Sequence, residues 1–142
     1  MDAYSGVVYP AAVAIFLLLM LVGGLRLLTA PARVLLRVMV VAAWVASAVQ
    51  ALAIVALLAT AEGQPSLPMT IGYLIASIAL LPLLGVGHLG EPRKPGSQAD
   101  PERPVLSPSQ VAQVNAMAAV LVGAALVVVA WRLHAIVLTV VP

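Results

Sequence analysis

The sequence predicts an all-α, polytopic membrane protein: a four-transmembrane-helix bundle with an N-out/C-out orientation. The first observation is composition, because 63% of the 142 residues are hydrophobic and 8% are charged. A soluble domain is about 45–50% apolar and about 25% charged, so this composition disfavours a water-soluble fold. The second observation is a series of four apolar runs, each long enough to cross a bilayer of about 30 Å at 1.5 Å per residue.

The third observation is the position of the basic residues. Six of the seven lie in or beside two of the three connections between the apolar runs. They are Arg26, Arg33 and Arg37 around the first connection, and Arg93, Lys94 and Arg103 in the third. The middle connection has Glu62 as its only charged residue. Basic connections stay on the cytoplasmic side, so this alternation predicts that both termini lie outside.

The first two spans are expected at residues 7–28 and 34–59. The connection between them is short and contains Pro31, which suits the first position of the following helix. The two spans should therefore form an antiparallel hairpin. Gly23 and Gly24, near the inner end of the first span, permit close approach of another helix, or a bend.

The third span is expected at residues 68–87 and is followed by a loop at residues 88–109. Pro82 lacks a backbone N–H, so it should kink the third span near its inner end. Gly72 and Ala76 have the spacing that favours tight contact between membrane helices. The loop is rich in proline and charge, which predicts a cytoplasmic segment without regular structure.

The fourth span is expected at residues 110–131, opening with the capping-box pattern of Ser107 and Gln110. Trp131 and Arg132 then fall at the outer interface, where an aromatic ring and a long basic side chain anchor a helix. The tail at residues 133–142 is apolar beyond that boundary. It requires either packing on another subunit or an inward shift of the helix.

The two histidines suggest a b-type haem, whose axial ligands must face each other at one membrane depth. The predicted topology places His88 near the inner surface and His134 near the outer one, separated by about 30 Å. They should not share one iron within a single copy of the chain. No cofactor is predicted, and no metal site.

Other chemistries find little support in the sequence. The chain has no cysteine, which removes thiolate ligands and disulfides. All five acidic residues fall in a terminus or a connection, whereas ion-coupled transport depends on an ionisable group within the membrane. Ser47, Thr70 and Ser77 have no base within reach, and a serine in an apolar helix usually bonds to the preceding turn. We therefore expect no catalytic residues, and the charge pattern indicates no nucleic-acid partner.

The remaining polar features are candidate contacts with a partner or a lipid. Trp44, Ser47 and Gln50 are spaced three residues apart and should line one helix face. The other candidates are Asn115, Trp131, Arg132 and His134.

The expected function is that of a non-catalytic accessory or assembly subunit of a larger integral-membrane complex. Its expected partners are the lipid bilayer and other membrane subunits, with a respiratory or electron-transport complex as the setting. The ratio of six Arg to one Lys indicates a GC-rich bacterial genome, and hence the bacterial plasma (inner) membrane. Two alternatives stay open: a small lipid- or quinone-binding carrier or flippase, and a haem-bearing membrane anchor.

Overall fold

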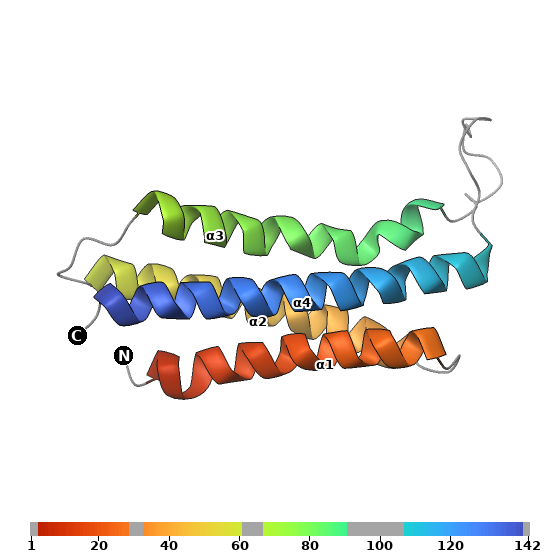
Figure 1. Cartoon of the computed structure of the whole chain (residues 1–142), viewed down its shortest axis with the longest axis horizontal. Helices are drawn as coiled ribbons and strands as arrows, with labels where there is room; N and C mark the ends of the chain where they lie inside the picture. Colours follow the sequence, from red (N-terminus) through yellow and green to blue (C-terminus); the bar gives the residue numbers. More distant parts are fainter. Residues whose placement is uncertain (1–2, 29–32, 61–66, 91–106, 141–142) are drawn as a thin grey trace.

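The chain folds into long helices that lie alongside one another (Figure 1). The computed structural model describes residues 3–28, 33–60, 67–90 and 107–140. The elements in chain order are η1 (Tyr4–Val8), α1 (Tyr9–Leu28), α2 (Arg33–Thr60), α3 (Leu67–Leu80), η2 (Leu81–Gly90) and α4 (Pro108–Val140). Within the described ranges, four helical stretches are long and apolar enough to cross a membrane, which confirms the helical part of the prediction. They are Tyr4–Leu28, Val34–Thr60, Leu67–Gly85 and Pro108–Thr139.

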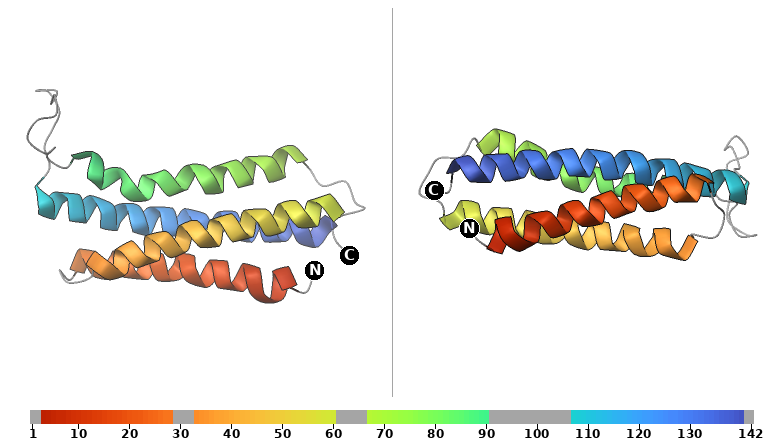
Figure 2. Two further views of the ribbon diagram at one scale, coloured as in Figure 1. Left: turned by 180° about the vertical axis from the view of Figure 1, so that it is seen from behind. Right: turned by 60° about the horizontal axis from the view of Figure 1, so that its bottom comes forward.

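The bundle has two chemically different ends. The first and last described parts of the chain lie together at one end, with the end of α2 and the start of α3 (Figures 1 and 2). We call this the terminal end. The end of α1, the start of α2, the end of η2 and the start of α4 lie at the other, which we call the arginine end because Arg26, Arg33 and Arg37 are there.

Most of the predicted connections lie outside the described residues. The residues outside the described ranges are 1–2, 29–32, 61–66, 91–106 and 141–142. Three expectations fall on these residues: those for the connection that contains Pro31, for the middle connection that contains Glu62, and for most of the loop at 88–109.

The third span changes its helix type at Pro82, where a kink was expected. Helix α3 ends at Leu80, and the chain continues as the 3-10 helix η2 from Leu81 to Gly90. A proline has no N–H to donate to the preceding turn and crowds that turn's carbonyl, so the α-helical pattern is interrupted there. Leu81 and Leu84 of η2 are nevertheless buried in the core, so the altered segment still belongs to the bundle.

Helix α4 begins with the predicted capping box. The Ser107 backbone N–H donates to the Gln110 Oε1 atom at 2.9 Å, and the Gln110 N–H donates to the Ser107 Oγ atom at 3.3 Å. The helix then continues to Val140, well past the expected end of the span at residue 131. The apolar tail is part of this helix because Leu133 and Val137, each 1% exposed, pack against other helices of the same chain. The buried face of the tail thus packs on its own chain, and the two outcomes expected for the tail, packing on another subunit or an inward shift of the helix, stay predictions.

Helices α1 and α4 approach each other closely through glycines. A Cβ atom at Gly23 would lie 2.9 Å from the Ala116 carbonyl oxygen, and one at Gly123 would lie 3.0 Å from the Phe16 carbonyl oxygen. Each glycine thus makes room for the backbone of the facing helix. The expectation for Gly72 is wrong within this chain, because nothing lies within 4 Å of its built Cβ position and the residue is exposed.

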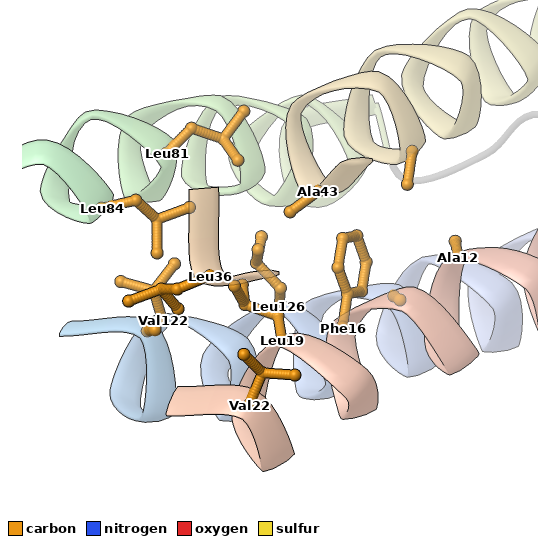
Figure 3. Close-up of a cluster of buried hydrophobic side chains, with 13 residues drawn as sticks. Ala12, Phe16, Leu19, Val22, Leu36, Ala43, Leu81, Leu84, Val122 and Leu126 are labelled. Carbon is orange, nitrogen blue, oxygen red and sulfur yellow. The ribbon is translucent and has the colours of Figure 1, made fainter. Parts of the chain in front are cut away.

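The buried side chains form two groups along the bundle. The larger one joins α1, α2, η2 and α4, and Figure 3 shows Phe16 and Leu19 of α1 in it, facing toward α2 and η2. The smaller one lies toward the terminal end and contains Tyr4, Ile54, Leu133 and Val137. Side chains on the outer surface are also apolar, with Leu52 and Leu121 each 71% exposed, as a lipid-facing surface requires.

Candidate functional site

A π-helical turn at the start of the first span brings two tyrosines together. The Tyr9 backbone N–H donates to the Tyr4 carbonyl oxygen, five residues back along the chain. In an α-helix, residues five apart point about 140° away from each other. The hydrogen bond of a π-turn spans five residues, so Tyr4 and Tyr9 follow one another on nearly the same face. That face is turned toward α4.

Both tyrosine rings contact His134 of α4. The Tyr9 ring is stacked on the imidazole, with 3.9 Å between centroids and 8° between planes. The Tyr4 ring lies 5.9 Å from the imidazole and is tilted by 40°. The Tyr4–His134 distance lies within the range of favourable aromatic pairs, and the Tyr9–His134 pair is a closer, nearly parallel stack. His134 is therefore half-buried between the last part of α4 and the two tyrosine rings.

Four buried side-chain atoms of the described residues have no hydrogen-bond partner. They are the hydroxyl oxygens of Tyr4 and Ser47, the Gln50 Nε2 atom and the His134 Nδ1 atom. Tyr4, Ser47 and Gln50 are each at most 4% exposed. Buried polar atoms are nearly always paired in folded proteins, so a group of four without partners marks this region.

The four residues come from three helices, and Tyr4 lies beside both Gln50 and His134. The Gln50 side chain of α2 lies next to the Tyr4 hydroxyl, although the two fall outside hydrogen-bond geometry. Tyr4 in turn contacts His134, and Ser47 is one helical turn from Gln50 on α2. We call Tyr4, Tyr9, Ser47, Gln50 and His134 the aromatic–polar cluster.

Trp44, Ser47 and Gln50, which were expected on one helix face, do not share a face in the structure. Ser47 and Gln50 are buried, whereas Trp44 is 45% exposed. A spacing of three residues falls about 60° short of a full turn, so two such steps carry Gln50 about 120° away from Trp44. Trp44 thus faces the surroundings and does not join the aromatic–polar cluster.

Three other polar side chains have interaction partners. The Ser77 hydroxyl donates to the Leu74 carbonyl oxygen at 2.7 Å, the arrangement expected for a serine in an apolar helix. Thr70 is 1% exposed, and both Thr70 and Asn115 have interaction partners. Asn115 is half-buried near the arginine end of α4, away from the cluster.

Trp131 and Arg132 are on the outer surface of α4. Trp131 is 55% exposed, and the Arg132 guanidinium carbon lies 5.3 Å from its ring centroid, within the range of a cation–π contact. Neither side chain enters the cluster, although both precede His134 closely in sequence. Because a helix advances about 100° per residue, His134 lies two to three positions further on, on another side of α4.

The two histidines lie toward opposite ends of the bundle, as the topology predicts. His88 belongs to η2 near the arginine end, and His134 belongs to the last part of α4 near the terminal end. A haem held by both within one copy is incompatible with this arrangement. Among the described residues, no three His, Cys, Asp or Glu side chains form a group that could hold a metal ion.

The sequence-based reasoning missed Tyr4 and Tyr9. Tyr4 precedes the first expected span at residues 7–28, and both tyrosines resemble ordinary aromatic residues of a membrane interface. Their spacing of five would have separated them on an α-helix, so only the π-turn makes them neighbours. Comparison with protein-family models, curated proteins and solved structures gives no match for this chain.

Proposed function

We propose that this protein is a non-catalytic accessory or assembly subunit of a larger complex in a bacterial plasma membrane. The expected setting is a respiratory or electron-transport complex. In this proposal the helices cross the membrane with the arginine end on the cytoplasmic side and both termini outside. The alternation of basic connections supports the orientation, and the four long apolar helices support insertion.

The observation that carries the proposal is the exposed cation on the side of α4. About 12 Å of helix separates Arg132 from Val140, at 1.5 Å per residue. Arg132 is therefore set back from the terminal end of the bundle, and its side chain is exposed beside apolar surface. An arginine at the centre of a membrane helix costs about 2.5–3.5 kcal/mol on insertion scales, unless it snorkels or is paired.

Arg132 fits a carboxylate on a membrane helix of another subunit. A guanidinium binds a carboxylate through two parallel hydrogen bonds, and this pairing is strong where water is scarce. The Trp131 ring beside it adds an amphipathic surface of the kind enriched at interfaces between proteins. Together the two side chains form an outward-facing site with one charge and a large apolar ring.

The test is co-purification from the native membrane with a tagged full-length chain. After extraction in mild detergent, we expect the wild type to migrate in native gels within a discrete complex that contains other subunits. Arg132→Leu should release the chain from that complex, and Arg132→Lys should retain part of it because the charge remains. Trp44→Phe alters the other exposed tryptophan and should leave the complex intact.

Three results would count against this function. One is a wild-type chain that migrates alone, or only with copies of itself. Another is an intact complex containing the Arg132→Leu variant. The third is an equal loss of the complex with Asp2→Asn or Glu62→Gln, because Arg132 would then be paired with a carboxylate of its own chain.

A further inference from the structure

The aromatic–polar cluster has the composition of a site for a neutral hydrogen-bond acceptor. Each unpartnered atom in it is able to donate: two hydroxyl groups, an amide nitrogen and an imidazole nitrogen. Arg132 belongs to the outer surface of α4 and lies over Trp131, so the cluster itself holds no cation for an anionic ligand. None of the five acidic residues lies in a described helix, so no described carboxylate attracts a cation there.

The position of the cluster agrees with a ligand that is partly apolar. At 1.5 Å per residue, His134 lies about 9 Å along α4 from Val140, and Gln50 lies about 15 Å along α2 from Thr60. Around it are Ile54, Leu133 and Val137, each at most 1% exposed. A ligand reaching this depth needs a body that tolerates hydrocarbon and oxygens that accept hydrogen bonds.

The π-turn shows that the backbone is adapted to this arrangement. Such turns are rare and occur often at functional sites. Here the turn places both tyrosines against one histidine, and nothing lies within 4 Å of a built Cβ at Gly6 in the middle of it. Packing at Gly6 therefore does not account for the π-turn, whereas the two ring contacts with His134 do.

We propose that the aromatic–polar cluster binds the carbonyl oxygens of a neutral, apolar-bodied ligand. The Tyr4 hydroxyl, the Gln50 amide and the His134 imidazole are its hydrogen-bond donors. This chemistry is shared by the headgroup of an isoprenoid quinone and by the ester linkage of a membrane lipid. Tyr9 holds the imidazole in place by stacking, and Ser47 extends the row of donors one turn toward the middle of α2.

The binding experiment uses the purified full-length chain in nanodiscs of ether-linked phosphatidylcholine, which contains no ester carbonyl. Decylubiquinone and dioctanoylglycerol are the probes, and the readouts are saturable binding and the infrared carbonyl band of the bound probe. We expect one probe to bind saturably, with its carbonyl band shifted to lower frequency by hydrogen bonding. The probe that binds identifies the source as a quinone or as a lipid ester.

Three substitutions connect that binding to the cluster. Tyr4→Phe removes one hydroxyl and keeps the ring against His134, so the variant should fold and bind about tenfold more weakly. Gln50→Leu should have a similar effect. Asn115→Leu removes an amide from the other half of the bundle and should bind as the wild type does. Saturable binding of neither probe overturns the proposal, and so does binding that Tyr4→Phe and Gln50→Leu leave unchanged.

Changing the number of residues between Tyr4 and Tyr9 tests whether the π-turn acts by bringing the two rings onto one face of the helix. Deleting Gly6 places the tyrosines four residues apart, which puts them on one face of an ordinary α-helix, so probe binding should persist. Inserting one alanine after Gly6 places them six residues apart, and neither an α-turn nor a π-turn then aligns them. The insertion should abolish the shift of the probe's carbonyl band. If the band shift survives the insertion but is lost on deletion, the π-turn does not act by aligning Tyr4 and Tyr9.

Discussion

The hydroxyl-bearing side chains of the described helices differ in whether their own helix supplies a hydrogen-bond partner. The hydroxyl groups of Thr60, Ser77 and Thr139 all donate to carbonyl oxygens three or four residues back. Ser47 has the same opportunity, yet its buried hydroxyl has no partner. A sequence shows that a serine is present in an apolar helix, but the rotamer that decides between these outcomes depends on the packing around it. The unsatisfied donors of the aromatic–polar cluster were therefore visible only in the structure.

The capping box of α4 gives a prediction for a single residue. Ser107→Ala removes the acceptor of the Gln110 N–H and should reduce the stability of the first turn of α4 by about 1 kcal/mol. Hydrogen exchange of the Gln110 amide should then be about fivefold faster. Ser109→Ala is the matched control, since the Ser109 side chain contacts only the Ser107 hydroxyl among the hydrogen bonds described for this turn. Equal acceleration in both variants would show that the box is not the source of the protection.

Among the elements, the contact between α1 and α4 illustrates what a pattern of small residues can and cannot predict. The Gly23-Gly24 pair correctly indicated close approach of another helix, and Gly72 with Ala76 indicated one that does not occur within the chain. Small residues permit close contact, but the partner is chosen by the large side chains on either side of them. Phe16 and Leu19, both buried, direct that face of α1 into the core. The π-turn had no sequence signal, because it depends on the contacts of Tyr4 and Tyr9 with His134 on α4.

Adjacent glycines in α1 provide a matched test of this contact. Gly23→Ala forces a methyl group against the Ala116 carbonyl oxygen and should lower the free energy of unfolding by about 1–3 kcal/mol. At Gly24 nothing lies within 4 Å of the added Cβ, so Gly24→Ala should be neutral or stabilising by up to about 1 kcal/mol. Reversible unfolding in mixed detergent micelles measures both values. If Gly24→Ala destabilises the protein as much as Gly23→Ala, the close approach of α1 and α4 is not what these glycines provide.

For the whole molecule, the sequence predicted four long apolar helices, because an apolar run of this length satisfies its own backbone groups best as a helix. An even number of antiparallel helices also predicts that the first and last described parts of the chain lie at one end, as they do in Figure 1. The lengths of the helices were harder to predict, since the tail after Arg132 is apolar whether it leaves the bundle or continues it. Leu133 and Val137 decide that question by packing against Tyr4 and Ile54, contacts between residues far apart in the chain.

The proposed function includes a bundle that spans the membrane with its terminal end outside, and the absence of native cysteine allows a direct measurement. Thr139→Cys places one thiol at the terminal end, and Ser109→Cys places one at the arginine end; both positions are exposed. We predict that a membrane-impermeant maleimide labels the Thr139→Cys variant in intact cells and labels the Ser109→Cys variant only after the membrane is permeabilised. Labelling of the Ser109→Cys variant alone in intact cells would contradict the orientation, and equal labelling of both would contradict the four crossings.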